Sequence, residues 1–198
     1  MTRPKTLLTW AALAGACAGL AACGGSTKTA DIPSANADTG TAATTTTETT
    51  TTTATPAFAK PTAEVKKIAD GISTDTKKKP KIPTPSGKPP AKLTVVDIVK
   101  GTGAVAQNGD TLTVDYAGNS RSTGKEFDAS WNSGQTFPVT LGQGQVIQGW
   151  DQGLVGMKQG GRRLLVIPPG LGYGASGSPP KIKPNETLLF VIDLRKKG

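Results

Sequence analysis

The sequence predicts an α+β domain in which a twisted antiparallel β-sheet wraps around one short α-helix. Past the opening segment, most large apolar side chains lie between Leu93 and the end of the 198-residue chain. That part contains five runs typical of strands and a single run typical of a helix, with strands on both sides of the helix. Strands that do not alternate regularly with helices favour an α+β arrangement over a parallel sheet.

The first two strands are predicted at residues 93–99 and 111–116. In the second, Leu112, Val114 and Tyr116 alternate with polar residues. A period of two is typical of a strand with one buried face, so this strand is expected to cover the core.

Residues 146–157 form the predicted helix, between strands at 137–141 and 162–167. Its apolar residues recur at the spacing of one helix face and are Val146, Ile147, Trp150, Leu154 and Met157. The last predicted strand, at 187–194, follows a loop at 168–184 that is rich in glycine and proline. Loops of this length in compact domains are usually functional or disordered.

The first 22 residues are predicted to be a lipoprotein signal peptide. Arg3 and Lys5 precede an apolar run that is marginal for a membrane-spanning helix. The run ends in Leu-Ala-Ala-Cys at residues 20–23, which resembles the bacterial lipobox, and Cys23 is therefore the predicted lipidation site. We expect the chain to be exported and anchored through this lipid to the outer face of the bacterial cell membrane. The alternatives are an ordinary secretory peptide or an uncleaved anchor, with an incidental cysteine.

Residues 23–91 are predicted to be a low-complexity linker. A threonine-rich stretch comes first, and a basic stretch rich in proline and lysine follows from residue 77 to residue 90. Residues 61–72 could form one or two helical turns, but an isolated helix of that length is marginal in water. The folded domain is therefore predicted to cover residues 92–198.

Composition excludes several kinds of chemistry from this domain. The chain has no histidine, and its two cysteines, Cys17 and Cys23, both precede the domain. Thiol catalysis, disulfides and metal sites built from cysteine or histidine are thus excluded there. The formal net charge is +9, or +7 without Arg3 and Lys5 of the predicted signal peptide, which predicts weak attraction to anionic surfaces. The alternative is a basic linker that is simply solvated and self-repelling. Nucleic acid is a poor candidate partner, because the lysines gather in a proline-rich stretch without interleaved aromatic residues.

Seven short motifs follow one another in the domain. They are VDYAG (114–118), GKEFDAS (124–130), VTLG (139–142), VIQGWDQGL (146–154), GMKQG (156–160), YG (173–174) and TLLF (187–190). In this order they resemble the FK506-binding protein (FKBP) family, over about residues 92 to 196. The resemblance implies an FKBP-like fold and a monomeric peptidyl-prolyl cis-trans isomerase. Such an enzyme rotates X-Pro bonds in unfolded or exported polypeptides without a metal or an organic cofactor.

The resemblance also implies a substrate pocket. Its catalytic residues would be Tyr116, Asp128 and Tyr173, and its substrate-binding residues Phe127, Phe137, Val146, Ile147, Trp150, Ile182 and Phe190. In related proteins, the main-chain N–H matching Ile147 binds a substrate carbonyl and the hydroxyl matching Tyr173 donates a second hydrogen bond. The aspartate matching Asp128 lies near the twisting carbonyl, which implies an electrostatic and orienting role together with the Tyr116 hydroxyl. The alternatives are ordinary core packing for the apolar residues and turn capping for Asp128.

Isomerisation of this kind needs no nucleophile. Rotation about an X-Pro bond crosses a barrier of about 18–20 kcal/mol, because twisting removes amide resonance. An apolar pocket that strips water from the imide carbonyl favours the less polar twisted state, and a roughly thousandfold acceleration needs only about 4 kcal/mol of such preference. A domain without histidine or cysteine is suited to this mechanism.

Four positions depart from familiar FKBP sequences. Ser133 stands where well-known members have an arginine, Gln145 where a glutamate is familiar, Ser178 in place of a histidine and Lys181 in place of an isoleucine. These changes predict weak rather than tight macrolide binding, and Lys181 would favour acidic residues beside the substrate proline. Two other functions agree with the sequence. One is a chaperone module with the same pocket but little turnover, and the other is a structural lipoprotein whose basic linker adheres to the cell wall.

Overall fold

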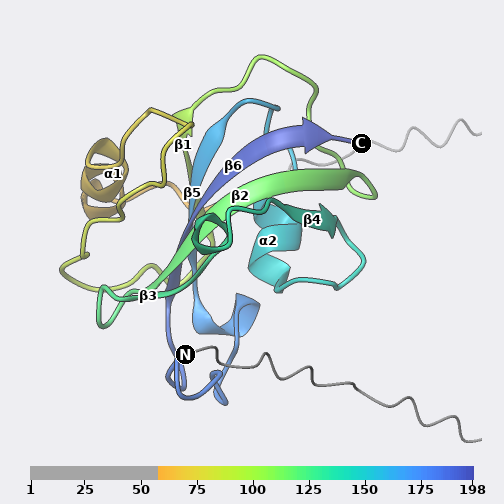
Figure 1. Ribbon diagram of the computed structural model, residues 1–198. Helices are drawn as coiled ribbons and strands as arrows, with labels where there is room; N and C mark the ends of the chain where they lie inside the picture. Colours follow the sequence, from red (N-terminus) through yellow and green to blue (C-terminus); the bar gives the residue numbers. More distant parts are fainter. Residues whose placement is uncertain (1–57) are drawn as a thin grey trace, which may run out of the picture. The chain divides into compact units, whose positions relative to one another are not determined.

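The computed structural model describes residues 58–198, which form six strands and two α-helices (Figure 1). The strands are β1 (Thr94–Val99), β2 (Thr111–Ser120), β3 (Glu126–Ala129), β4 (Phe137–Thr140), β5 (Arg162–Ile167) and β6 (Leu188–Lys197). The helices are α1 (Ala63–Asp70) and α2 (Gln148–Gly153), and short 3-10 turns lie at Ser130–Asn132 and Pro169–Leu171. The predicted signal peptide and the lipidation site Cys23 lie outside the described residues. No helix within residues 58–198 has the length and hydropathy needed to cross a bilayer.

Every strand pairing in the sheet is antiparallel. The strand order is β1-β5-β6-β2-β3, and β4 pairs with the first half of β2, at residues 111–114, while β3 pairs with residues 117–119. The long strands β2 and β6 run side by side over α2 (Figure 1). The predicted α+β class, with an antiparallel sheet and one short helix against it, is confirmed.

All five predicted strands are present, and β5 has the predicted bounds. The sequence did not predict β3 as a strand. Its four residues include Glu126 and Asp128, and acidic residues are disfavoured in strands. Because β3 lies at the edge of the sheet, these side chains can remain in water.

Helix α2 is shorter than the predicted 146–157 and lies very close to β5. Ile147 is extended, with ψ of 146°, so the helix begins only at Gln148 and leaves Val146 and Ile147 in the preceding loop. Two glycines allow the close approach to the sheet. A Cβ atom on Gly149 would lie 2.5 Å from Ile167 Cγ2, and one on Gly153 would lie 2.8 Å from Leu165 Cδ2. Glycine is therefore required here by packing, despite its cost to a helix.

The other face of the sheet is covered by α1 and the segment that follows it. Val65, Ile68 and Ile72 are at most 4% exposed, and with Ile82 they form a second core. Their partners in the sheet are Ala117, Leu164, Val166, Leu189 and Val191. This differs from the predicted linker, which extended to residue 91. The strands β5 and β6 are apolar on both faces and need a cover on each, and α1 supplies the second.

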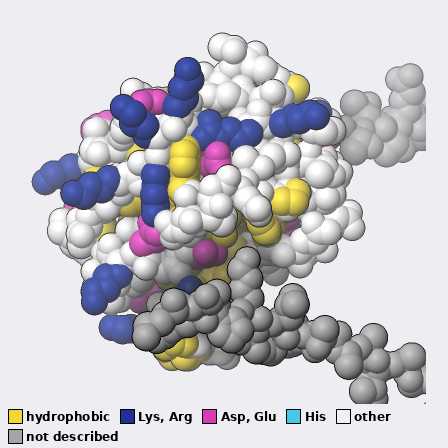
Figure 2. Space-filling model, viewed as in Figure 1, with side chains coloured by type: hydrophobic (Ala, Val, Ile, Leu, Met, Phe, Trp, Pro, Cys, Tyr) yellow, Lys and Arg dark blue, Asp and Glu magenta, His cyan; other side chains and the backbone are white. Residues whose placement is uncertain are grey.

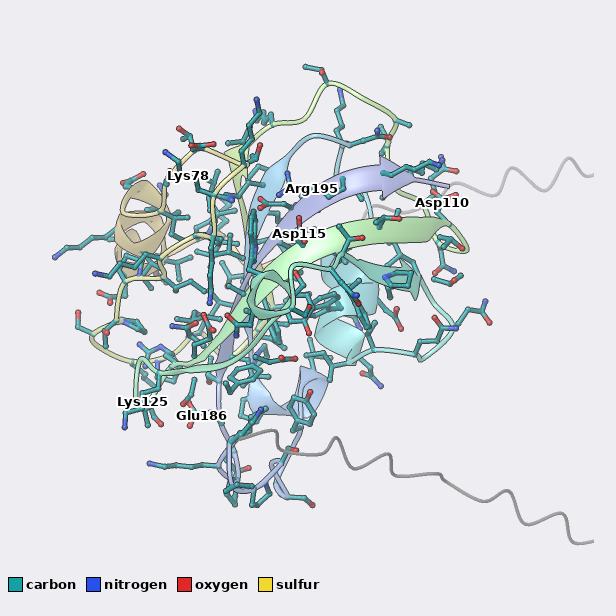
Figure 3. The ribbon with its side chains drawn as sticks, in the orientation of Figure 1. Lys78, Asp110, Asp115, Lys125, Glu186 and Arg195 are labelled. Carbon is teal, nitrogen blue, oxygen red and sulfur yellow. The ribbon has the colours of Figure 1, made fainter. Side chains whose placement is uncertain are left out.

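Two arginines hold the segment after α1 against the sheet. Arg162 is fully buried, forms a two-point ion pair with Asp193 (2.6 and 2.7 Å), and donates to the carbonyls of Ser73 (2.7 Å) and Lys78 (2.9 Å). Arg195 pairs with Asp115 on β2 (2.6 Å), as Figure 3 shows, and donates to the carbonyl of Thr76 (2.7 Å). Residues 73–78 are thus part of the folded unit.

Candidate active site

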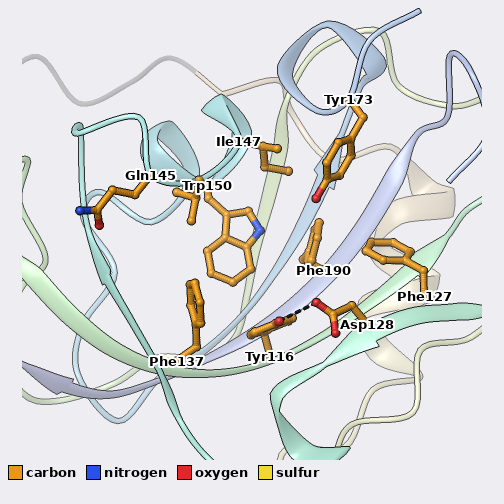
Figure 4. A pocket seen from close by; sticks show the side chains of 10 residues that line it. Tyr116, Phe127, Asp128, Phe137, Gln145, Ile147, Trp150, Tyr173 and Phe190 are labelled. Carbon is orange, nitrogen blue, oxygen red and sulfur yellow. Dashed lines mark hydrogen bonds between the residues drawn. The ribbon is translucent and has the colours of Figure 1, made fainter. Parts of the chain in front are cut away.

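A pocket of about 430 Å³ opens between α2, the inner face of the sheet and the loop after β5 (Figure 4). It is lined by Tyr116, Phe127, Asp128, Phe137, Gln145, Val146, Ile147, Trp150, Tyr173 and Phe190. The structure therefore brings together nine of the ten residues predicted for the site. The tenth, Ile182, does not line the pocket.

Ile182 packs beneath the loop instead. It is 4% exposed and belongs to the core between α2 and the sheet. Its N–H donates to the Ser178 carbonyl (2.9 Å), and the Ser178 N–H donates to the carbonyl of Ile182 (2.9 Å). Ile182 thus anchors the loop through core packing, and its contact with a substrate stays a prediction.

Aromatic rings form the floor and walls of the pocket. The Trp150 ring is 5.2 Å from the ring of Tyr116 and 5.2 Å from that of Phe190 between centroids, and both pairs are edge to face. Phe137 (6.2 Å from Trp150) and Phe127 (5.5 Å from Phe190) extend the walls in the same geometry. Edge-to-face contacts fix the orientation of each ring, so the cavity keeps its shape without a ligand.

Trp150 reaches the floor because α2 presents it toward the sheet. Its side chain is 4% exposed, whereas Phe137 at the mouth is 38% exposed. A ring that enters from the mouth would therefore leave water progressively and come to rest on the indole.

Hydroxyl groups and one carboxylate form the polar side of the pocket. The Tyr116 hydroxyl donates a 2.7 Å hydrogen bond to Asp128 Oδ2. The Tyr173 side chain, 39% exposed, directs its hydroxyl into the pocket from the opposite wall (Figure 4). Burial, reinforced by the negative charge of Asp128, raises the pKa of both tyrosines above the usual value. Both hydroxyls therefore keep their protons, and remain donors, at neutral pH.

The Asp128 carboxylate lacks an ion-pair partner within the part of the chain that the structure describes. Its hydrogen bond goes to Tyr116 rather than to the backbone of a turn. Ser133, at the position where an arginine was expected, donates to the Ser130 carbonyl (2.9 Å). The carboxylate thus faces the pocket as an unneutralised charge.

The loop before α2 gives the pocket a main-chain donor. Ile147 occupies the N-cap position of α2, and its N–H has no acceptor among the described residues. Gln145, which sequence reasoning treated only as a departure from the family pattern, also lines the rim, and its Oε1 accepts from the Thr140 N–H (3.2 Å). That hydrogen bond ties the loop to β4 and holds Ile147 at the mouth.

The described residues contain no cluster of His, Cys, Asp or Glu able to hold a metal ion. The chemistry available within the pocket is that of an apolar cavity with tyrosine hydroxyls, a main-chain N–H and one carboxylate. Such a site can bind a ring, desolvate an amide and orient its carbonyl groups.

Known proteins share both the sequence and the fold of this domain. The family model for the FKBP-type peptidyl-prolyl cis-trans isomerase matches residues 103–195. An FK506-binding protein of Streptomyces anulatus is 56% identical over 117 residues, which are 59% of this chain and 94% of the relative. A probable FK506-binding protein of Corynebacterium glutamicum is 46% identical over 116 residues, 59% of this chain and 96% of the relative. A solved structure, described as the crystal structure of AtFKBP13, aligns with a TM-score of 0.50 and 38% identity over 56% of this chain and 96% of that chain.

Proposed function

Because the chain belongs to the FKBP family of peptidyl-prolyl cis-trans isomerases, we propose that its aromatic pocket rotates X-Pro bonds of exported polypeptides by desolvation and hydrogen bonding, without a covalent intermediate. The observation that carries this proposal is the buried Trp150 floor beside the polar pair of Tyr116 and Asp128. One side of the cavity can hold a pyrrolidine ring, and the other can interact with the amide that twists.

The proline ring lies on Trp150 in this mechanism. The walls formed by Phe137 and Phe190 prevent the ring from turning, so the rotation is carried by the residue that precedes proline. Water leaves the imide carbonyl as the ring enters. Planar imides are more polar than twisted ones and lose more hydration, so desolvation lowers the barrier.

Hydrogen bonds then fix the rest of the substrate. The Ile147 N–H, which has no acceptor among the described residues, would bind one substrate carbonyl, and the Tyr173 hydroxyl would donate to another. Both donors hold the flanking chain while the imide turns, which converts binding energy into orientation.

Asp128 acts electrostatically in this proposal. Its carboxylate repels the partial negative charge of the imide oxygen and is oriented by the Tyr116 hydroxyl, 2.7 Å away. A planar imide, whose oxygen carries more negative charge than that of the twisted state, is thereby disfavoured.

An exchange assay with point variants tests this assignment. The 198-residue chain should shorten the cis-trans relaxation time of a Leu-Pro peptide, and Asp128→Val and Tyr173→Phe should each lower kcat/KM by about tenfold, the loss of roughly 1.4 kcal/mol of transition-state stabilisation. Asp70→Val, at the exposed end of α1, serves as a control for the loss of a carboxylate. Full activity of both site variants would remove the assignment. Peptide binding without any acceleration would favour the chaperone alternative.

We also propose that the chain acts outside the cell while bound to the membrane through a lipid on Cys23. The support is the lipobox-like tetrad at residues 20–23 and the threonine-rich stretch that follows it. Labelled palmitate should be incorporated into the chain and should be absent from Cys23→Ser. Labelling of that variant at the level of the parent would contradict a lipid at this position.

Macrolide binding is proposed to be weak. The pocket offers the aromatic floor that a ring-containing ligand needs, but Gln145 at its rim and Ser133 after β3 both lack a charge. Titration with FK506 should give a clearly weaker complex than with an FKBP that has an arginine and a glutamate there. Equal affinity for the two proteins would contradict this proposal.

A further inference from the structure

A second hollow lies directly beyond the wall of the aromatic pocket around Trp150, which is called the proline pocket below. It measures about 280 Å³ and is lined by Ser120, Thr123, Lys125, Glu126, Phe127, Pro180, Lys181 and Lys183. Phe127 lines both this hollow and the proline pocket. A polypeptide whose proline rests on Trp150 would therefore enter the second hollow if it leaves the pocket past Phe127.

Two lysines are placed there by the loop after β5. The two main-chain hydrogen bonds between Ser178 and Ile182 close this loop into a tight bridge, and the buried Ile182 side chain anchors it to the core. Side chains alternate along extended backbone, so the neighbours of an inward-pointing residue point outward. Lys181 and Lys183, which flank Ile182, therefore both project from the loop, and both line the hollow.

The third lysine comes from the hairpin between β2 and β3. Lys125 immediately precedes β3, and its carbonyl accepts from the Ser120 N–H (2.9 Å). Figure 3 shows Lys125 at this end of the sheet, close to Glu186, whose carboxylate accepts from the N–H (2.8 Å) and the hydroxyl (2.7 Å) of Ser122 in the same hairpin. These bonds fix the hairpin that carries the lysine.

Neighbouring acids do not neutralise the three lysines. Glu126 accepts from Lys79 (2.8 Å) and Asn132 (3.0 Å), and Glu186 is 6% exposed and bonded to Ser122. Among residues 58–198, neither Lys125, Lys181 nor Lys183 forms an ion pair. In Figure 2, basic side chains gather toward the α1 and β3 side of the face shown, and few lie over α2 and β4. The hollow is thus a positive surface at one end of an apolar pocket.

We infer that this hollow is a subsite for an acidic residue that flanks the substrate proline, so that the enzyme selects clients with Glu or Asp beside X-Pro. The inference rests on the proposed isomerase function of the adjoining pocket. Solvent-exposed charge pairs are weak singly, but three cations around one hollow act on the same carboxylate. We expect a Glu peptide to have a kcat/KM about threefold to tenfold above that of its Gln counterpart at low salt, mostly through KM.

The test compares matched peptides on the 198-residue chain. Each peptide contains one Leu-Pro bond and carries Glu, Gln or Lys two or three residues before or after the proline. The preference for Glu over Gln should occur on one side of the proline, should reverse for Lys, and should vanish when salt is raised to about 0.5 M, where exposed charges are screened. The Glu to Gln ratio is the kcat/KM of the Glu peptide divided by that of the Gln peptide. It should fall to about one in a variant of the enzyme that carries Lys125→Gln, Lys181→Gln and Lys183→Gln.

A control variant removes the same charge elsewhere. Lys66→Gln, Lys100→Gln and Lys158→Gln affect exposed lysines away from the hollow and should leave the Glu to Gln ratio at the parent value. If the parent chain accelerates Glu and Gln peptides equally at low salt, the subsite is refuted while the isomerase proposal stands. If the control variant loses the ratio too, the preference reflects the net charge and the subsite is also refuted. If neither peptide is accelerated, both proposals fail.

Discussion

The Tyr116 hydroxyl donates a 2.7 Å hydrogen bond to Asp128 Oδ2 and so joins β2 to the edge strand β3 inside the pocket. Asp128 has no cation beside it among the described residues. The tyrosine therefore determines where the carboxylate points. A second residue of the hairpin supports this arrangement, because Ser130 Oγ accepts from the Tyr116 N–H (3.0 Å).

This pair should behave as one unit in a double-mutant cycle. Tyr116→Phe and Asp128→Val should each lower kcat/KM about threefold to tenfold, a loss of about 0.7–1.4 kcal/mol of transition-state stabilisation, because each removes the hydrogen bond that orients this pair. The kcat/KM of the double variant should be only slightly below that of the less active single variant, because each single change already removes the shared hydrogen bond. Proline-peptide exchange measures all four chains. Losses that multiply fully would show that the two residues act independently.

Replacement of the pocket floor should affect both stability and activity. Trp150→Leu removes the edge-to-face contacts with Tyr116, Phe137 and Phe190 and leaves a cavity, which should lower the free energy of unfolding by about 2–4 kcal/mol. Exchange activity per folded molecule should fall by more than about tenfold, because water then reaches the bound imide. Denaturant unfolding and the exchange assay measure the two effects.

Trp150→Phe is the matched control for this change, since it keeps a ring at the same place. Trp150→Phe should retain more of the parent's free energy of unfolding and exchange activity than Trp150→Leu does. A Trp150→Leu chain that is folded and as active as the parent would contradict the role of the floor.

The cover formed by α1 should be needed for stability but not for chemistry. Ile68→Ala removes a side chain that is 4% exposed and should lower the free energy of unfolding by about 2–5 kcal/mol. Lys66→Ala, at an exposed position of the same helix, should change the free energy of unfolding by no more than about 0.5 kcal/mol. Activity of the folded fraction should match the parent in both, because α1 and the pocket lie on opposite faces of the sheet. Identical unfolding curves for Ile68→Ala and the parent would show that α1 does not stabilise the domain.

The two tyrosines of the chain, Tyr116 and Tyr173, both lie in the pocket, so tyrosine absorbance reports on it alone. Burial and the charge of Asp128 raise the pKa of each tyrosine in the folded chain, whereas an unfolded tyrosine has a pKa of about 10. The folded chain should therefore show less tyrosinate at about pH 10 than the chain in denaturant, which should be half ionised there.

The sign of the linked effect on stability follows from the same shift. A group whose pKa is raised by folding stabilises the native state fully below its unfolded pKa, and this contribution is lost as pH rises toward the folded pKa. The free energy of unfolding should thus decline above about pH 10. In Asp128→Asn the tyrosinate signal should appear at lower pH than in the parent. Superimposable titrations of the folded and unfolded parent chain would contradict the raised pKa values.

Most of the sheet could be predicted from local pattern. Leu112, Val114 and Tyr116 alternate as a half-buried strand does, and they lie on β2. The cover by α1 could not be recognised from the helix by itself, because eight residues have little tendency to fold alone. The signal was in β5 and β6, whose nearly continuous apolar runs predict burial on both faces.

The pocket residues were assigned through resemblance, and the structure places nine of the ten together. The sequence could not distinguish Ile182 from the residues that line the pocket, since an apolar residue in a loop can point toward a ligand or toward the core. The contribution of Lys125 and Lys183 to the second hollow was also missed. It arises because the loop after β5 lies against the β2–β3 hairpin, two segments that are far apart in the sequence.

The relaxation time of a proline peptide measures the central claim most directly, namely that the apolar pocket around Trp150 stabilises a half-rotated imide better than a planar one. Substoichiometric amounts of the chain should shorten the cis-trans relaxation of a Leu-Pro peptide, which takes roughly tens to hundreds of seconds without catalysis, in proportion to its concentration. A relaxation time that stays unchanged at high concentrations of the folded chain would contradict the account.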